Sequence, residues 1–410
     1  MSKPVLRRAR TPRHRGGPVA VLLLACGGLL PLIIAALPTA PGVRAVIDVQ
    51  RGGQSPAVVS PDVRPGRRVV FRIRAPQATE VRLVAGDIPD NRRGAPMVRG
   101  EEDIWEVTLG PLGAGAYRYN FNVDGVSVID PRNPAVSESN NNVWSLVYVP
   151  GSDFMDLREV PHGAVAEVPY YSGSLGTFRR LHVYTPPGYE QSRDRYPVFY
   201  LLHGAGDCDD AWSSVGRAGI ILDNLIAAGR ARPMVLVMPS GHIRPWESEP
   251  EPTPAAGAFE QDFLADIMPF VQEHYRVYSD QGHRAIAGLS MGGSQTLNIV
   301  FSDLEQFGYV GVFSSGLIGS FGRRRSGAES DAPSWEERHA GVLEDARLRA
   351  GLQLLWFATG REDFLIETSR STVEMLRSHG FGVDYHESEG GHTWLNWRDY
   401  LQQFAPVLFR

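Results

Sequence analysis

From about Asp156 onward, short apolar segments alternate with longer amphipathic ones, and this alternation limits the fold more than any other feature of the sequence. Short apolar runs bounded by turn residues are typical of buried strands, whereas the longer segments have the spacing of helices. Strands that alternate with helices favour a mostly parallel sheet that is covered by helices on both faces. The expected strands are 196–203, 234–239, 284–289, 309–314, 352–359 and 383–388, and the expected helices include 220–228, 259–275, 295–301 and 366–378.

Residues 46–150 follow another pattern, that of short strands joined by turns. The β-branched or aromatic runs are 68–75, 80–85, 104–109, 116–123 and 144–149, and Asp124-Gly125 lies between two of them as a hairpin signal. So many short strands in about 100 residues favour an all-β sandwich. The sequence therefore predicts a sandwich at 46–152 and an α/β domain at 153–410, and the length of 410 residues agrees with more than one domain.

The first 45 residues have the layout of an export signal. A basic stretch from Lys3 to Arg15 precedes the apolar run 18–37, and small residues follow up to an expected cleavage site near Val43-Arg44-Ala45. A single membrane anchor is the alternative, because the run approaches the roughly 20 residues that span a bilayer. Two glycines and a proline interrupt the run, so we favour the cleaved signal. We expect residues 1–45 to be a signal peptide and the protein to be secreted or periplasmic, without stable insertion in a membrane.

Charge and cysteine content exclude several classes of protein. Seven of the 41 basic residues lie in 1–45, which holds no acidic residue, so the remaining chain has a net charge of −12. A chain this acidic is a poor candidate for nucleic-acid binding, which depends on clustered Lys and Arg. Cys26 and Cys208 are the only cysteines, which excludes a disulfide scaffold and a cysteine-based structural zinc site, and the apolar run continues past Cys26, which disfavours a lipid anchor there. No His or acidic cluster has the spacing of metal ligands, so we expect neither a metal nor another cofactor.

The string Gly288-Leu289-Ser290-Met291-Gly292 lies directly between an expected strand and an expected helix. A G-x-S-x-G in this position is the nucleophile elbow of α/β-hydrolases. Small neighbours are needed because the serine occupies a strained turn that raises its hydroxyl above the sheet. Ser290 is therefore the predicted nucleophile, and it requires a base to take its proton.

The base and the acid should follow the serine in the order Asp or Glu, then His. Of the four histidines downstream, His392 follows Gly390-Gly391 after the last expected strand and so lies on a loop, whereas the other three lie in helical or strand segments. The strand 352–359 leads into Gly360-Arg361-Glu362-Asp363. We prefer Asp363 to Glu362 as the acid that orients His392 and stabilises the imidazolium.

The second donor of an oxyanion hole should come from the loop after an early strand. The string 201–207 (LLHGAGD) fits, because its glycines let the backbone approach a substrate. We expect the backbone N–H groups of Ala205 and Met291 to form the oxyanion hole. His203 is expected to support this loop rather than to act as a base.

With these strings the chain resembles the esterase D-like family of α/β-hydrolases, in particular the feruloyl and acetyl-xylan esterases of carbohydrate esterase family one. The resemblance implies the α/β-hydrolase fold, a triad of Ser290, Asp363 and His392, and an oxyanion donor directly after Gly204. Siderophore esterases and mycolyltransferases belong to the same superfamily, so the resemblance implies the chemistry more firmly than the substrate. The matching strings are LLHGAGDCDDAW (201–212), DNLIAAGRARPMVLVMPSG (223–241), RAIAGLSMGG (284–293), TGRED (359–363) and EGGHTW (389–394).

The sandwich segment resembles early-set, immunoglobulin-like modules that are related to the carbohydrate-binding domains of glycogen-branching enzymes. The resemblance lies in residues 117–125 (YRYNFNVDG) and the following Asp130-Pro131. Such modules bind glycans through exposed aromatic side chains, so polysaccharide binding by this domain stays open. The alternative, which we favour for each single residue, is a place in the core of the sandwich. The aromatic residues concerned are Trp105, Tyr117, Tyr119, Phe121 and Trp144.

Three tryptophans near the expected site are candidates for contact with a substrate. Trp212 lies beside the oxyanion loop and Trp394 beside the base, and each could instead pack its loop. Trp246 lies in 241–258, a segment that follows a strand end and is either a lid over the site or a solvated surface loop. Cys208 is near the site in sequence, but nothing there activates its thiol, and we expect a bystander.

These residues predict an exported serine esterase. Ser290 attacks an ester carbonyl, His392 shuttles the proton, an acyl-enzyme forms and water releases the acid. The expected substrate is a feruloyl or acetyl ester of plant cell-wall polysaccharide, with the sandwich directing the enzyme to the polymer. The alternatives are hydrolysis of a siderophore trilactone and acyl transfer to a sugar. A non-catalytic glycan-binding protein is the alternative of another class, and the intact order of serine, acid and histidine argues against it.

Overall fold

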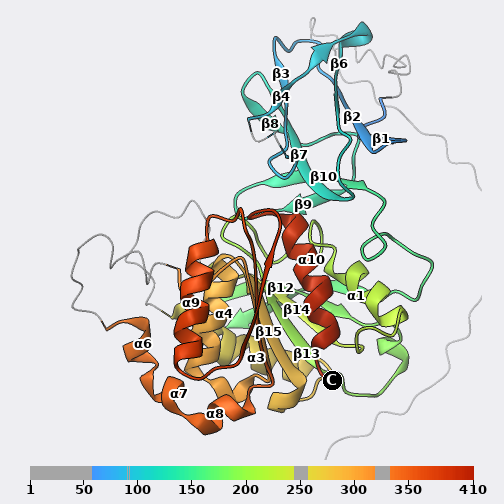
Figure 1. The fold of residues 1–410 in the computed structure, drawn as a ribbon. Helices are drawn as coiled ribbons and strands as arrows, with labels where there is room; N and C mark the ends of the chain where they lie inside the picture. Colours follow the sequence, from blue (N-terminus) through green and yellow to red (C-terminus); the bar gives the residue numbers. More distant parts are fainter. Residues whose placement is uncertain (1–57, 90, 92, 244–256, 319–332) are drawn as a thin grey trace, which may run out of the picture. The chain divides into compact units, whose positions relative to one another are not determined.

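The computed structural model of the 410-residue chain describes residues 58–89, 91, 93–243, 257–318 and 333–410 (Figure 1). The predicted signal peptide and Trp246 lie outside these residues. All that is described belongs to one compact unit, Pro56–Arg410. In these ranges no helix combines the length and the apolar character that a membrane crossing requires.

The N-terminal part of this unit is a sandwich of two antiparallel sheets. One sheet has the strand order β1-β2-β6-β5 and the other β4-β3-β7-β10-β9, with β8 paired to β7 through the predicted Asp124-Gly125 turn. Alternate residues of the strands point inward, and Phe71, Leu83 and Tyr119 are among the buried core. The strands are β1 (Asp62–Arg64), β2 (Arg68–Arg74), β3 (Val81–Val84), β4 (Ala95–Pro96), β5 (Val98–Arg99), β6 (Ile104–Leu109), β7 (Gly115–Val123), β8 (Val126–Val128), β9 (Val136–Glu138) and β10 (Val143–Val149).

The C-terminal part is built on one eight-stranded sheet of order β11-β12-β14-β13-β15-β16-β17-β18. The six strands from β14 to β18 run parallel, as the sequence predicts, and β11 and β12 add an antiparallel edge. The inner strands of such a sheet are buried on both faces, which explains the nearly continuous apolar sequence of β13 to β16. The edge strand β18 is partly exposed and largely polar. The strands are β11 (Ala164–Ser172), β12 (Thr177–Thr185), β13 (Val198–Leu202), β14 (Val235–Pro239), β15 (Arg284–Leu289), β16 (Tyr309–Phe313), β17 (Leu354–Gly360) and β18 (Val383–Ser388).

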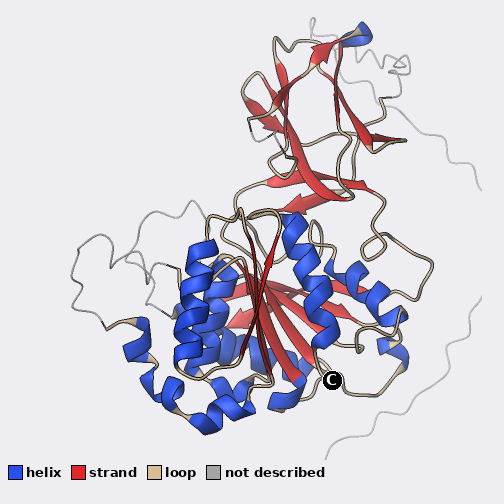
Figure 2. Ribbon diagram, in the orientation of Figure 1, coloured by secondary structure: helices blue, strands red, loops and turns tan. Residues whose placement is uncertain are grey.

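Helices cover both faces of this sheet (Figure 2). Successive residues of β15 point to opposite faces, so that Ile286 packs with α3, α4 and α9 while Ala285 and Ala287 pack with α1 and α10. A π-helical turn, Phe263–Ile267, joins α2 to α3. Together the three segments form one continuous helix where the sequence predicts a helix at 259–275. The helices are α1 (Ala218–Ala227), α2 (Ala258–Asp262), α3 (Met268–His274), α4 (Met291–Ser302), α6 (Trp335–Arg338), α7 (Ala340–Glu344), α8 (Ala346–Gly351), α9 (Ile366–Ser378) and α10 (Trp394–Phe404).

The hairpin of β11 and β12 and the helix α10 are absent from the expectations drawn from the sequence. The hairpin of β11 and β12 forms the antiparallel edge, and most residues of β11 are exposed, so its sequence lacks the apolar run of a buried strand. Helix α10 begins two residues after His392 and is rich in tryptophan, tyrosine and asparagine, which are weak helix formers. Burial of its aromatic side chains against the sheet stabilises this helix despite that composition.

Candidate active site

Ser290 lies at the turn between β15 and α4, in a backbone conformation that few residues other than glycine adopt. Its φ is 51° and its ψ −117°, a strain that is typical of a serine presented on a nucleophile elbow. The turn has no room for larger neighbours. A Cβ on Gly288 would lie 2.2 Å from the carbonyl oxygen of Gly292, and a Cβ on Gly292 would lie 2.5 Å from that of His203. The two glycines therefore allow β15 to turn into α4 at this point.

Ser290, His392 and Asp363 form a chain of hydrogen bonds. The Oγ of Ser290 is 3.0 Å from Nε2 of His392, and Nδ1 of His392 is 3.0 and 2.9 Å from the two carboxylate oxygens of Asp363. Asp363 is 2% exposed and also accepts the backbone N–H of Leu365 at 2.9 Å. A carboxylate at Nδ1 favours the tautomer with the proton on Nδ1, so Nε2 can accept the proton of the serine.

The acid and the base lie on loops that follow the neighbouring parallel strands β17 and β18. The two loops touch: the backbone N–H of Glu362 donates to the carbonyl of Gly390 at 3.0 Å, and a Cβ on Gly360 would lie 2.1 Å from the same oxygen. The carboxyl ends of parallel strands meet at one edge of a sheet, where ligand sites of α/β folds are found. This contact brings together Asp363 and His392, which are 29 residues apart in the chain.

His203 holds the predicted oxyanion loop from below. Its Nε2 accepts the backbone N–H of Gly241 at 2.8 Å, and its Nδ1 lies 2.8 Å from the carbonyl oxygen of Gly204. Burial lowers the pKa of His203 to about 4, so the ring is neutral at pH 7 and carries its proton on Nδ1. With both ring nitrogens engaged by the backbone, His203 fixes the loop and has no free nitrogen for base catalysis.

The two expected oxyanion donors belong to segments next to Ser290. Ala205 lines the cleft next to Gly204, whose Cβ position would be 3.5 Å from Cβ of Ser290. Met291 is the first residue of α4, and the first N–H groups of a helix have no partner within it and favour negative charge. That these two N–H groups stabilise an oxyanion stays a prediction.

Ser290 and His392 open into a cleft of about 790 Å³. Its wall from the α/β part carries three aromatic rings, and its residues are Phe364, Trp394, Trp397, Leu289, Thr393 and the loop Gly204–Asp207. Its wall from the sandwich is largely polar and consists of Asp87, Arg118, Ser139, Asn141, Trp144 and Gly86. The cleft therefore offers an apolar side and a polar side to one substrate.

The structure separates the three candidate tryptophans. Trp394 lines the cleft. Trp212 is 0% exposed, donates its Nε1–H to the carbonyl of Leu202 at 3.0 Å and packs edge-on against Trp394 with ring centroids 5.0 Å apart. Trp212 is therefore a buried neighbour of Trp394 and is not among the residues that line the cleft. Trp246 lies outside the described residues, so its expected role stays a prediction.

Phe364 and the polar residues of the sandwich are parts of the cleft that the sequence analysis missed. Phe364 is 75% exposed, and its ring lies 4.5 Å from that of His392. It directly follows Asp363, so its position next to the predicted acid was a usable signal. The sandwich residues had none, because only the tertiary structure brings them to the serine.

Four of the five aromatic residues that we weighed in the sandwich lie in its core. They are Trp105, Tyr117, Tyr119 and Phe121. The fifth, Trp144, is half-buried, donates its Nε1–H to Oγ of Ser139 at 3.1 Å and lines the cleft. An aromatic side chain of the sandwich therefore faces the same space as the serine.

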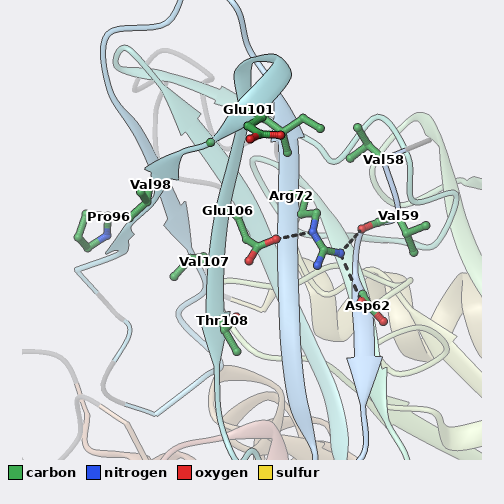
Figure 3. A pocket seen from close by; sticks show the side chains of 12 residues that line it. Val58, Val59, Asp62, Arg72, Pro96, Val98, Glu101, Glu106, Val107 and Thr108 are labelled. Atoms are coloured by element: carbon green, nitrogen blue, oxygen red, sulfur yellow. Dashed lines mark hydrogen bonds and ion pairs between the residues drawn. The ribbon is translucent and has the colours of Figure 1, made fainter. Parts of the chain in front are cut away.

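A second hollow, of about 850 Å³, lies over β2, β5 and β6 on the sandwich (Figure 3). Arg72 lies in it, 2.5 Å from Glu106 and 3.3 Å from Asp62. The side chains around this ion-pair group are mainly aliphatic and acidic, among them Val59 and Val98. It offers no aromatic ring for a sugar to stack on among the residues that line it.

Two further observations bear on the chemistry of the site. Burial raises the pKa of the Cys208 thiol to about 12, which fits the expected bystander, since a thiol reacts as the thiolate. Within the described ranges, no three His, Cys, Asp or Glu side chains are grouped so that they could hold a metal ion.

Two models of known protein families match this chain, one in each of its two parts. The family model described as "Putative esterase" matches residues 172–407. A second model, carbohydrate-binding module 48 (isoamylase N-terminal domain), matches residues 57–137. The first match covers more than half of the chain, and the second covers most of the sandwich.

Individual relatives and solved structures that are similar to this chain are also named as esterases. An endo-1,4-beta-xylanase/feruloyl esterase of Xylanibacter ruminicola is 29% identical over 350 residues, which are 83% of this chain and 44% of that protein. The chain thus spans less than half the length of this curated relative. Among solved structures, a ferulic acid esterase is 26% identical with a TM-score of 0.51, over 60% of this chain and 97% of the other. The enterobactin esterase of Shigella flexneri shares the fold at 18% identity and a TM-score of 0.56, over 83% of this chain and 92% of the other.

Proposed function

Because the chain belongs to the esterase family of α/β-hydrolases and carries an N-terminal carbohydrate-binding-module 48 domain, we propose that it hydrolyses carboxylic esters with Ser290 as the nucleophile. The observation that carries the proposal is the hydrogen-bond chain from Ser290 through His392 to Asp363 at the floor of an open cleft. A structural serine has no need of a buried carboxylate and an imidazole in this order.

The proposed reaction follows from the positions of these groups. Nε2 of His392 removes the proton of the Ser290 hydroxyl as Oγ attacks the ester carbonyl. The N–H groups of Ala205 and Met291 stabilise the oxyanion of the tetrahedral intermediate. His392 then protonates the leaving alcohol, which leaves an acyl-enzyme, and the same groups activate the water that releases the acid and restores Ser290.

Feruloyl and acetyl esters of plant cell-wall polysaccharide are the substrates that we propose. The aromatic wall of Phe364, Trp394 and Trp397 suits an aromatic acyl group. The polar wall of Asp87, Ser139 and Asn141 suits the hydroxyl groups of a sugar alcohol. The names of the relatives, a xylanase/feruloyl esterase and a ferulic acid esterase, support this choice. Export by the N-terminal segment, which we also propose, would place the enzyme where such polymers are.

A siderophore trilactone esterase is the second candidate. It is favoured by one observation: the enterobactin esterase of Shigella flexneri matches 83% of this chain, whereas the ferulic acid esterase matches 60%. At 18% identity that likeness concerns the fold, so this candidate ranks below the first.

The test compares the full chain with its Ser290→Ala variant and, as a matched control, Ser302→Ala, an exposed serine at the other end of α4. We expect a fluorophosphonate probe to label the wild type and Ser302→Ala but not Ser290→Ala. On methyl ferulate, acetylated xylan, a short-chain nitrophenyl ester and a catecholate trilactone, we expect turnover of the first three that vanishes only in Ser290→Ala. Labelling of Ser290→Ala at the wild-type rate contradicts the nucleophile, and turnover of the trilactone alone selects the second candidate.

The aromatic wall is tested separately with Phe364→Ala. We expect KM for methyl ferulate to rise several-fold while KM for a nitrophenyl acetate stays within twofold, because only the ferulate ring would lie against Phe364. Equal effects on both esters would show that Phe364 does not contact the acyl group.

A further inference from the structure

The loop that carries Ala205 is held from outside by the sandwich. Arg118 of β7 donates from Nη2 to Oδ1 of Asp207 at 2.6 Å, across 89 residues of sequence. Arg118 is 7% exposed and Asp207 6%, so this ion pair is shielded from water and salt. Asp207 in turn donates its backbone N–H to the carbonyl of Gly204 at 3.0 Å, which closes the turn that contains Ala205.

The same guanidinium also contacts the segment that follows the catalytic histidine. Its centre lies 5.6 Å from the ring centroid of Trp394, which is two residues after His392 and begins α10. Arg118 therefore contacts both the oxyanion loop and the segment that follows His392.

Arg118 is itself fixed within the sandwich. Its Nε is 3.6 Å from Oδ2 of Asp87, and its backbone N–H donates to the same oxygen at 3.2 Å. Burial alone would lower the pKa of Arg118, but the charges of Asp207 and Asp87 outweigh it and raise the pKa above its usual value. The arginine thus stays charged and is held in place on its own domain.

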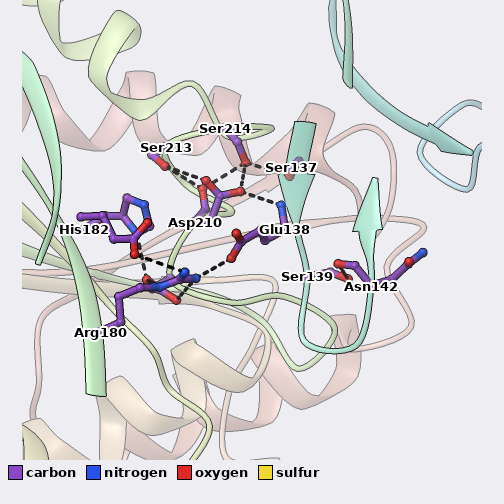
Figure 4. Close-up of polar contacts among 11 residues, drawn as sticks. Ser137, Glu138, Ser139, Asn142, Arg180, His182, Asp210, Ser213 and Ser214 are labelled. Carbon is purple, nitrogen blue, oxygen red and sulfur yellow. Dashed lines mark hydrogen bonds and ion pairs between the residues drawn. The ribbon is translucent and has the colours of Figure 1, made fainter. Parts of the chain in front are cut away.

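Further contacts join the sandwich to the same stretch of chain (Figure 4). The backbone N–H of Asn140 donates to the carbonyl of Gly206 at 3.3 Å, and that of Glu138 donates to Oδ2 of Asp210 at 2.8 Å. Arg180 of β12 donates to Glu138 at 2.5 Å. Among the contacts of the sandwich with this stretch, the one between Arg118 and Asp207 is a buried ion pair on the turn that contains Ala205.

We propose that Arg118 is a positioning residue for ester hydrolysis: through Asp207 and Trp394 it holds the oxyanion loop and the histidine loop at their working separation. This inference rests on the proposed function of Ser290, His392 and Ala205. It gives the sandwich a part in the chemical step, in addition to any binding of polysaccharide.

The proposal predicts that loss of Arg118 lowers kcat and leaves KM nearly unchanged. An oxyanion exists only in the transition state and the tetrahedral intermediate, so a displaced donor lowers kcat with little effect on the binding of the ester. Removal of one oxyanion donor costs about 10²–10³ in kcat, and a loop that is loosened rather than lost should cost less, about tenfold or more.

The experiment uses the full chain and a soluble short-chain nitrophenyl ester, which needs no polysaccharide binding. The variants are Arg118→Ala, Arg118→Lys and Asp207→Asn, and the matched control is Glu138→Gln, which removes another ion pair between the two parts. We expect kcat to fall at least tenfold in Arg118→Ala and Asp207→Asn with KM within threefold, to recover in part in Arg118→Lys, and to stay within twofold in Glu138→Gln. If Arg118→Ala does not fold, Arg118→Ala/Asp207→Ala removes both charges together, and the same loss is expected.

Amide hydrogen exchange of peptides covering 203–212 provides a readout that needs no activity. We expect faster exchange in Arg118→Ala than in the wild type and in Glu138→Gln. Unchanged exchange and unchanged kcat in Arg118→Ala, or a change confined to KM, overturn the proposal and leave the esterase intact. A wild-type protein that neither labels with fluorophosphonate nor turns over any ester overturns the proposed function instead, and the exchange rates then still decide whether Arg118 holds the loop.

Discussion

Asp363 and Glu362 are adjacent carboxylates in opposite environments. Asp363 is buried and accepts from His392 and from the backbone of Leu365, whereas Glu362 is exposed. Both carboxylates follow the serine and precede the histidine, so the order of residues allows either of them to be the acid. The sequence alone favoured Asp363 without excluding Glu362. What separates them is the direction in which the tight turn after β17 points each side chain, which is a property of the folded loop.

Replacement of these two residues is the first prediction. Asp363→Asn keeps the shape but removes the charge that stabilises the imidazolium and selects its tautomer, so kcat on a nitrophenyl ester should fall by about 10²–10⁴. Glu362→Gln should leave kcat within twofold. The reverse pattern would assign the acid to Glu362.

The burial of His203 predicts a dependence of stability on pH. Its pKa is lowered from 6.5 to about 4 in the folded state, so between these values the unfolded chain binds a proton that the folded chain excludes. The free energy of unfolding should therefore be unaffected by His203 above pH 6.5 and should decrease as the pH falls toward 4, by on the order of 3 kcal/mol. Urea unfolding between pH 4.5 and 7.5 measures this.

His203→Gln is the comparison for that measurement. It should be less stable at pH 7, because it loses backbone hydrogen bonds, but its stability should decrease less steeply below pH 6.5, because one titrating group is gone. Parallel curves for the two proteins would mean that His203 keeps its ordinary pKa in the fold.

The elements that carry the site are the ends of parallel strands, and these were predictable because each leaves a local pattern. The elbow between β15 and α4 and the loop after β17 could be found from glycines placed after apolar runs. The loop after β18 could be found from Gly390-Gly391, which precede His392. The hairpin of β11 and β12 and helix α10 could not, because exposure on a sheet edge and burial of weak helix formers are decided by tertiary packing. The polar wall of the cleft was missed for the same reason: Arg118 meets Asp207 across 89 residues of sequence.

The contact between the loops after β17 and β18 yields a prediction at the scale of elements. A Cβ at residue 360 would lie 2.1 Å from the carbonyl oxygen of Gly390, so Gly360→Ala must push apart the loops that carry Asp363 and His392. We expect a loss of at least tenfold in kcat and a destabilisation of about 1–3 kcal/mol. Gly382→Ala, near the other end of β18, where a Cβ would meet nothing within 4 Å, should leave kcat unchanged. If the two variants have the same kcat, the loops accommodate the added Cβ at residue 360 without displacing Asp363 and His392, and the prediction is wrong.

For the molecule as a whole, buried contacts tie the sandwich to the α/β part. Arg398 of α10 is 1% exposed and donates from Nη1 to the carbonyl of Ala116 in the sandwich at 3.1 Å and to that of Val215 at 2.8 Å. Chains with more than one domain often unfold in steps. Arg398 and Arg118 are buried between the two parts. Separation of the parts would therefore break their hydrogen bonds and the ion pair of Arg118 at the same time.

We therefore predict that residues 56–410 unfold in a single transition. Calorimetry and far-UV circular dichroism should give the same midpoint, and the calorimetric and van't Hoff enthalpies should agree. Arg398→Ala should lower that midpoint by several degrees, because two buried carbonyl groups lose their donor. Two resolved transitions in the wild type would show that the parts unfold independently.

The contact of Arg398 with Ala116 also has a consequence for the time during translation at which the cleft can form. The two residues are 282 positions apart, which at about 5–20 residues per second corresponds to on the order of 15–60 seconds of translation. The last strand of the sandwich, β10, ends at Val149, early in that interval, whereas the loop with His392 and α10 are made at its end. The cleft and the predicted base His392 are therefore complete only after α10 has been made.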